Sequence, residues 1–393
     1  MTETFDIAIV GAGITGCAIA RQLARFDLCI CVVEAANDIA LGASKANGGL
    51  VHAGYDPAPG TVKAQVNARG CELYGTWSQE LGFLFRRVGS MVLGFNDDDR
   101  AHLEQLRCNG LANGVPELSI VGPDRIHELE PRASADATCA LWCPSTGFVD
   151  PFEVAIAALE NAVANGVTFM RSAPVEAIEV AGSGDDVRFS LATPAGNVRC
   201  HYLINAAGNR AADISHMAGA EEFQMVWRQG NIVVLDKEPR TLMPLYPVPT
   251  PVSKGVIVTG TVHGNTVITA TAAVREPDDT QTYASDMNAL LTGARKLVPD
   301  LDTRRVVRAQ RRSSGHSGYE RLLYWAVRRG ARPVPGGGHS VAGRGERAGH
   351  CRAHGACDAW GWCGAARACR LGSDSPRAGR LRPCVARAQG GAD

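Results

Sequence analysis

The chain has 393 residues with 40 basic and 40 acidic side chains, so its formal net charge is zero, and 45% of its residues are hydrophobic. This apolar content excludes a disordered chain, and the length allows two or three domains. No apolar run reaches the roughly 18 residues that cross a bilayer, and residues 1–6 lack a charged-then-apolar signal segment. We therefore expect a cytoplasmic protein; peripheral association with the inner face of the membrane is the alternative.

Residues 5–34 predict a β-α-β unit. A β-branched apolar run over 5–10 leads into Gly-Ala-Gly-Ile-Thr-Gly, a helical pattern covers 17–26, and a second apolar run ends at Glu34. In such a G-x-G-x-x-G turn the glycines allow a tight turn, close approach of a pyrophosphate and close helix packing, and the acid accepts hydrogen bonds from ribose. The pattern favours FAD or NAD over NADP. The predicted cofactor-binding residues are Gly11, Gly13, Ile14, Thr15, Gly16 and Glu34.

Residues 36–54 read as a Gly- and Ser-rich loop with few large side chains, so a flat ring system could lie against it. We place Ala43, Ser44, Asn47, Gly48 and Gly49 at the cofactor. His52 and Tyr55 follow the loop. Both side chains are candidates for a functional role. The alternative is that they only pack against neighbouring residues.

The rest of residues 55–310 predicts alternating helices and strands. Helices are expected over 60–80, 97–114, 151–165, 211–217 and 282–298, and strands over 167–170, 175–180, 187–191 and 201–207. The strand ending at Ala207 and Gly208 makes a second strand–glycine–helix crossing, where backbone could again meet the cofactor. Alternation over 225–275 predicts an antiparallel sheet. The eight cysteines before residue 311 form no disulfide or metal framework, and we expect no metal site.

Together these motifs resemble the FAD-dependent oxidoreductases of the D-amino-acid-oxidase-like superfamily. The branch most similar to the chain is that of the soluble FAD-dependent glycerol-3-phosphate dehydrogenases, with L-2-hydroxyglutarate oxidases nearby. The resemblance covers residues 5 to about 308. Its segments are Ile9 to Gly54, Lys63-Ala64, Arg69-Gly70, Asn205-Ala206-Ala207-Gly208, Val248 to Gly255 and Lys296 to Leu301.

The resemblance implies an α/β fold, in which a Rossmann-like FAD domain is built from separated segments and an α+β substrate domain is inserted between them. The expected FAD-domain segments are 1–80 and 148–218. The expected substrate-domain parts are 81–147 and 219–308. A third FAD-domain segment, with a loop over the flavin and an anion-binding Arg, belongs after residue 308 in the family.

The resemblance also implies roles for single residues. His52 would act as a base or contact the flavin, Tyr55 would hydrogen-bond the substrate, and Lys254 would pair with a phosphate or carboxylate. Arg228 and His263 are weaker candidates of the same kind, and the backbone at Val175 would contact the adenine side. The expected reaction oxidises a small 2-hydroxy compound, foremost sn-glycerol 3-phosphate to dihydroxyacetone phosphate. L-2-hydroxyglutarate and amino acids or amines are alternatives, and the electron acceptor is a quinone, oxygen or a partner flavoprotein.

Residues 309–393 form a tail unlike the rest of the chain. Residues 311–393 contain 15 Arg, no Lys and only 5 acidic residues, and they lack Ile, Phe, Met, Asn and Thr. A basic nucleic-acid arm and a Cys/His metal module are two interpretations, but such arms usually carry Lys and such modules close Cys pairs. We favour a third, translation of GC-rich DNA in a shifted frame, because a one-base shift approximately recovers the missing family motifs in order.

On this interpretation the tail is not natively folded, and its charge indicates no nucleic-acid partner. Without the third FAD-domain segment the chain itself would be inactive or would fold poorly. The remaining hypothesis is a truncated flavin domain fused to a real basic or metal-binding module.

Overall fold

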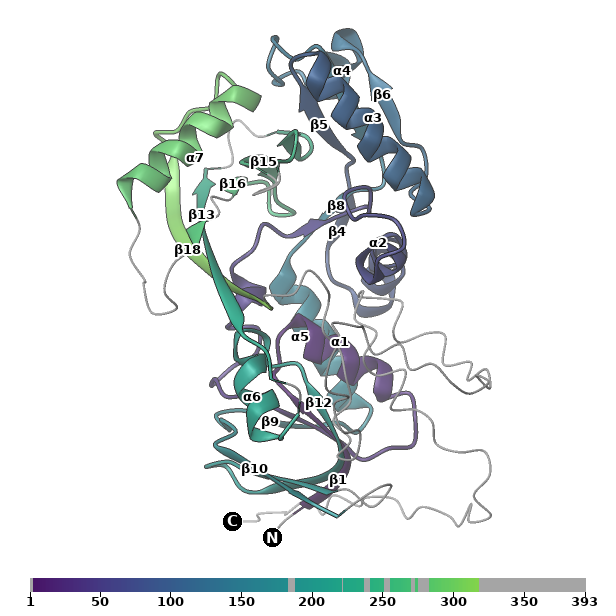
Figure 1. Ribbon diagram of the computed structural model, residues 1–393, viewed down its shortest axis with the longest axis vertical. Coiled ribbons are helices and arrows are strands. Elements are labelled where there is room, and N and C mark those ends of the chain that lie inside the picture. Colours follow the sequence, from purple (N-terminus) through teal and green to yellow (C-terminus); the bar gives the residue numbers. More distant parts are fainter. Residues whose placement is uncertain are drawn as a thin grey trace, which may run out of the picture.

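The computed structural model describes residues 3–182, 188–220, 222–236, 241–250, 255–269, 273–274 and 283–317, without the side chains of 3, 226–228, 273–274 and 310–317. In this part of the chain the strands form a six-stranded sheet, a nine-stranded sheet and a three-stranded sheet. The six-stranded sheet and the nine-stranded sheet occupy opposite ends of the molecule (Figure 1). We call them the lower sheet and the upper sheet, respectively.

The lower sheet has the strand order β10-β11-β12-β1-β2-β9. β12, β1, β2 and β9 run parallel, and β11 and β10 continue the sheet antiparallel. Its strands are β1 (Glu3–Val10), β2 (Ile30–Val33), β9 (Thr168–Met170), β10 (Ala177–Ala181), β11 (Arg188–Ala192) and β12 (Val198–Asn205). Short apolar runs thus form the buried parallel strands predicted for them.

Helices cover the lower sheet because its strands are apolar on both faces. Ile7 and Ile9 of β1 belong to the core shared with α1 (Ile14–Leu23) and α5 (Pro151–Ala164), which pack against each other (Figure 1). Ala8 and Val10 belong to the core that includes β11 and α6 (Ala211–Met217). This alternation is the period of two that a strand imposes.

The upper sheet joins two segments of chain, 90–143 and 225–317, where β14 pairs in parallel with β5. Its remaining pairings are antiparallel, as predicted for 225–275. The strands are β5 (Ser90–Gly94), β6 (Ser119–Val121), β7 (Cys139–Cys143), β13 (Met225–Leu235), β14 (Leu245–Pro247), β15 (Ile257–Gly260), β16 (Thr266–Thr269), β17 (Ala273–Val274) and β18 (Val306–Ser317).

Four further helices surround the upper sheet and the middle of the molecule: α2 (Val62–Leu81), α3 (Asp97–Ala112), α4 (Pro123–Leu129) and α7 (Ala284–Leu297). α7 packs Leu290, Ala294 and Leu297 onto the sheet core. The small sheet of β3 (Leu50–Val51), β8 (Gly147–Val149) and β4 (Phe85–Arg87) lies between the two large sheets (Figure 1). Two short 3-10 helices, η1 (Ala43–Lys45) and η3 (Gly208–Arg210), follow strands of the lower half.

Strand β18 crosses the boundary at residue 308 that the sequence predicts for the tail. Its backbone pairs with β13 from Val306, opposite Leu235, to Ser317, opposite Met225. The predicted aberrant tail otherwise falls on residues 318–393, which lie outside the described residues. Within the described part, no helix is both long and apolar enough to cross a membrane.

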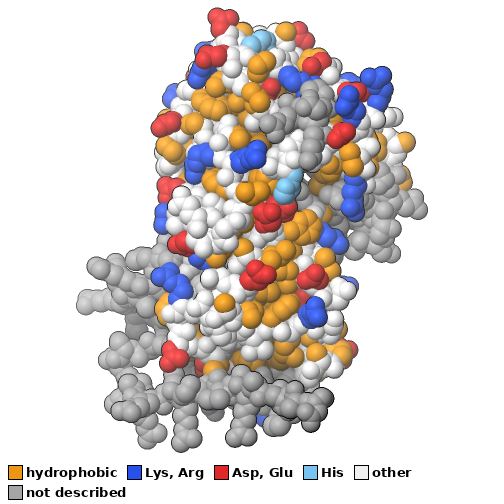
Figure 2. Space-filling view, turned by 180° about the vertical axis from the view of Figure 1, so that it is seen from behind, with side chains coloured by type: hydrophobic (Ala, Val, Ile, Leu, Met, Phe, Trp, Pro, Cys, Tyr) orange, Lys and Arg blue, Asp and Glu red, His pale blue; other side chains and the backbone are white. Residues whose placement is uncertain are grey.

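Exposed hydrophobic side chains lie along α5, at Phe152, Ile156 and Val163. Figure 2 shows hydrophobic side chains mixed with charged ones on the lower half of the face opposite to Figure 1. Isolated exposures of this kind are ordinary on protein surfaces, and we assign them no function.

Candidate functional site

The turn between β1 and α1 has no room for side chains at two of its glycines. Gly11 has φ +105°, and a Cβ atom there would lie 2.5 Å from the carbonyl oxygen of Ala206. A Cβ atom at Gly16 would lie 1.9 Å from the carbonyl oxygen of Gly11. Only glycine tolerates such approaches, so these two residues bring α1 and the end of β12 against the turn.

Gly13 occupies a different environment. It is the N-cap of α1, with φ −73° and no side-chain cap, and a Cβ atom would meet only Ser44 Oγ at 3.2 Å. The N–H of Ile14 donates to that same Oγ at 3.0 Å, and Thr15 is the next residue of the helix. The first N–H groups of a helix lack partners within it and carry a partial positive charge, so this end can bind an anion.

The loop after β2 is held in place by its own side chains. Asn47 donates through Nδ2 to the carbonyl oxygen of Ser44 at 2.8 Å, and its Oδ1 accepts from the N–H of Gly49 at 2.9 Å. Gly49 has φ +64°, and a Cβ atom there would lie 2.3 Å from the carbonyl oxygen of Val149. The loop therefore runs from the N-terminus of α1, near Ala43, to the small sheet.

Glu34 directly follows β2 and holds the backbone around the first turn. Its Oε2 accepts from the N–H of Ala12 at 2.7 Å and its Oε1 from the N–H of Ala36 at 2.9 Å. The segment after β9 runs beside it, since Ala173 donates its N–H to the carbonyl oxygen of Glu34 at 2.9 Å. Val175 lies two residues further along this segment, partly buried against the lower sheet.

The end of β12 adjoins the same turn. Ala206 donates its N–H to the carbonyl oxygen of Val10 at 2.9 Å, and Ala207 and Gly208 follow. Gly208 has φ +55° and open space around its Cβ position. Thus the second strand–glycine–helix crossing lies against the first.

These residues fit a dinucleotide. The second glycine leaves space that a Cβ atom would enter, beside a helix N-terminus that favours phosphate, and an acid stands at the end of the next strand. When FAD is bound, Gly13, Ile14 and Ser44 would hold its pyrophosphate and Glu34 its ribose.

A cavity of about 30 Å³ lies where the small sheet meets the upper sheet. His52 follows β3 and lines the cavity together with Tyr55, and Tyr246 of β14 lies opposite, its ring centroid 6.1 Å from that of His52. The other residues that line it are Gly54, Asp56, Pro57, Asn67, Val92, Pro247 and Pro249. The structure thus brings two of the three predicted catalytic residues to one cavity.

The two tyrosines of the cavity differ in their hydrogen bonds. Both are buried, at 7% and 4% exposure. The hydroxyl of Tyr55 is hydrogen-bonded to Ser90, whereas the buried hydroxyl of Tyr246 has no partner among the described residues. Burial raises the pKa of both phenols well above the ordinary value, so both remain protonated at neutral pH.

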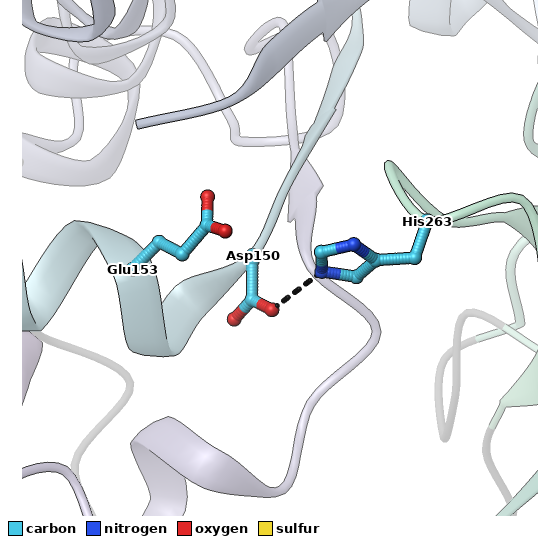
Figure 3. A group of neighbouring side chains, drawn as sticks. All are labelled: Asp150, Glu153 and His263. Atoms are coloured by element: carbon cyan, nitrogen blue, oxygen red, sulfur yellow. Dashed lines mark hydrogen bonds and ion pairs between the residues drawn. The ribbon is translucent and has the colours of Figure 1, made fainter. Parts of the chain in front are cut away.

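His263, another predicted substrate residue, does not line this cavity. Lys254 and the side chain of Arg228 lie outside the described residues. His263 is instead hydrogen-bonded to Asp150 at 2.8 Å, and Glu153 lies beside them (Figure 3). Asp150 caps α5 and Glu153 accepts from the N–H of Leu84, so both carboxylates already hold backbone, and we assign no metal to the group.

Sequence reasoning missed Tyr246 and Asn67, which meet at the cavity from β14 and α2. Neither belongs to a local motif with a known chemistry. Tyr246 and Pro247 directly precede the family-like segment Val248 to Gly255, and this position is the only sequence signal for a role of Tyr246. The sequence contains no comparable signal for Asn67.

Comparison with known proteins defines the class. The family model described as FAD dependent oxidoreductase (DAO) matches residues 6–371. The chain belongs to this family of FAD-dependent oxidoreductases, which confirms the resemblance and the cofactor predicted from sequence.

The chain is also similar in sequence to individual members of the family. A glycerol 3-phosphate dehydrogenase of Caloramator mitchellensis is 36% identical over 300 residues, which are 76% of this chain and 62% of that protein. The chain therefore spans less than two thirds of that relative. The human mitochondrial L-2-hydroxyglutarate dehydrogenase is 30% identical over 261 residues, 63% of this chain and 56% of that protein.

A solved structure supports the fold assignment. The L-alpha-glycerophosphate oxidase of Mycoplasma pneumoniae, solved with FAD bound, superposes with a TM-score of 0.76 and 26% identity, covering 81% of this chain and 85% of that one. The predicted α/β fold is confirmed by this likeness.

Proposed function

We propose that the chain oxidises sn-glycerol 3-phosphate to dihydroxyacetone phosphate. The observation that carries the proposal is the cavity at His52, which lies beyond the end of the loop predicted to lie along the flavin. The similarity of the chain to a glycerol 3-phosphate dehydrogenase and to a glycerophosphate oxidase also supports the proposal.

FAD, when bound, supplies the acceptor for a hydride equivalent from the alcohol carbon. The residues of the chain would do the rest. His52 would accept the proton of the reacting hydroxyl, because imidazole is the side chain whose ordinary pKa suits a base near neutral pH. Tyr55 would hydrogen-bond the substrate, and Lys254 would pair with its phosphate.

Turnover by the full chain, supplied with FAD, tests this proposal. We expect reduction of a dye acceptor with sn-glycerol 3-phosphate and at least a hundredfold lower kcat for His52→Gln, within the range of general-base effects of about 10²–10⁴. His102→Gln on α3 is the matched control and should leave kcat unchanged. Activity only with L-2-hydroxyglutarate, or only with amino acids, would favour those rivals. Comparing oxygen with a quinone would identify the electron acceptor.

We also propose that the Arg-rich tail arises from a shifted reading frame and lowers the activity of the full chain. Its composition beyond residue 310 supports this hypothesis. The test is the coding DNA, which must encode Val-Ala-Gly-Ile-Gln-Ser-Pro-Gly in the alternative frame. Zinc or DNA binding by the full chain, lost on removal of residues 318–393, would contradict it.

A further inference from the structure

Two buried polar atoms without a partner among the described residues belong to side chains that line the cavity at His52. They are the hydroxyl of Tyr246 and the Oδ1 atom of Asn67, and both residues line the cavity. An unsatisfied buried polar group is unfavourable in a folded protein, and native structures rarely keep one without a reason. Both atoms have almost no accessible surface, so a guest in the cavity would satisfy them after small movements of the two side chains.

The chemistry of the pair defines this guest. Tyr246 remains protonated and can donate, whereas Oδ1 of Asn67 can only accept. A group that accepts one hydrogen bond and donates another satisfies both, and an alcohol hydroxyl is such a group. The cavity of about 30 Å³ exceeds the roughly 10–15 Å³ that one water-sized group needs.

The rest of the lining favours a neutral group. Val92, Pro247 and Pro249 present apolar surface, and Asp56 adds an acidic side chain. A second carboxylate or phosphate would meet like charge and few donors in this place, which would be unfavourable. A hydroxyl carries no such penalty.

We propose that Tyr246 and Asn67 form a specificity subsite for the second, non-reacting hydroxyl of the substrate. The inference rests on the proposed function, in which His52 serves the reacting hydroxyl of glycerol 3-phosphate. Because the Tyr246 and His52 rings are 6.1 Å apart on one cavity, one small polyol can reach both. The subsite distinguishes a substrate with two hydroxyls from a 2-hydroxy diacid, which has only one.

Binding of the reaction product and its deoxy analogue tests the subsite. Dihydroxyacetone phosphate carries the second hydroxyl and hydroxyacetone phosphate lacks it, and neither has the alcohol that is oxidised. Calorimetric titration of the full chain with FAD should show about tenfold tighter binding of the first, as expected for two net hydrogen bonds. In Tyr246→Phe and Asn67→Leu this preference should fall below about threefold.

Two results would overturn the subsite while leaving the proposed function intact: equal binding of both ketones by the wild type, or an undiminished preference in both variants. Binding of 2-oxoglutarate but of neither phosphate ester would refute the proposed function, and with it the subsite for a second hydroxyl.

Thermal unfolding without substrate separates a substrate site from a fixed internal water. Removing an unsatisfied hydroxyl should leave the Tm of Tyr246→Phe unchanged or raise it by about 1–3 °C. Tyr55→Phe is the matched control, and its Tm should fall because that hydroxyl is bonded to Ser90. A lower Tm for Tyr246→Phe would show that protein or water already satisfies its hydroxyl and would overturn the subsite.

Discussion

Two alanine substitutions in the first turn separate cofactor binding from folding. In the folded chain a Cβ atom at Gly13 meets only the side-chain oxygen of Ser44, at 3.2 Å, and its φ of −73° suits any residue. A Cβ atom at Gly16 meets the backbone oxygen of Gly11 at 1.9 Å. The first contact is relieved by a small side-chain movement, whereas the second requires α1 to leave β1.

The expected magnitudes follow from these contacts. Gly13→Ala places a methyl group where the pyrophosphate must approach the N–H groups of α1. Hydrogen bonds to charged groups contribute about 1.5–3 kcal/mol each, so loss of one or two corresponds to about 3 kcal/mol, or more than a hundredfold in Kd. The unfolding free energy without FAD should change by less than about 1 kcal/mol. Gly16→Ala should lose about 3 kcal/mol of stability, at the upper end of ordinary overpacking.

The assay is titration of the apoprotein with FAD, followed by flavin fluorescence, together with urea unfolding of each apoprotein. Gly13→Ala must be stable and bind weakly, and Gly16→Ala must be unstable before any FAD is added. If Gly13→Ala binds FAD within about threefold of the wild type, the pyrophosphate does not approach this turn and the cradle is wrongly placed.

Three further predictions concern single side chains. Glu34→Gln should destabilise the apoprotein by about 1–3 kcal/mol in urea, because an amide NH₂ would replace one oxygen that accepts from Ala12 or Ala36; an unchanged midpoint would refute this. Burial raises the folded-state pKa of Glu130 above 4.5, so protonation favours the folded state. Wild type should therefore lose stability relative to Glu130→Gln as the pH rises from about 4 to 7, and a pH-independent difference would contradict the assignment. Burial raises the pKa of the Cys17 thiol to about 12, so peptide mapping at pH 8 should show Cys108, which is exposed, labelled by N-ethylmaleimide while Cys17 stays unlabelled.

Sequence could predict the lower half of the fold because its signals are local. The run from Phe5 to Glu34 contains strand, turn, helix and strand in order, and its close glycine contacts lie at Gly11 and Gly16, two positions of the motif. The ribose role of Glu34 remains a prediction, but its bonds to the backbone of Ala12 and Ala36 were not foreseen. They depend on how the chain returns to the turn after β2.

The cavity could not be predicted in full because its parts are distant in the chain. His52 and Tyr55 follow a recognisable loop, whereas Tyr246 reaches them only through the parallel pairing of β14 with β5. His263 is a weaker candidate from the sequence, and the turn between β15 and β16 places it at Asp150. Tertiary packing, which no local pattern encodes, determines where these side chains lie.

The central pair of the lower sheet has a consequence for how the chain folds. Glu3 pairs with Val198, so β1 meets its partner strand across about 195 intervening residues. A contact of such long range forms slowly, because the entropy cost of closing the loop comes before the stabilisation from strand pairing. During synthesis on the ribosome, one edge of β1 therefore stays unpaired until β12 has emerged. The intervening segment that builds part of the upper sheet has the opportunity to fold first, and the nucleotide-binding half is completed late.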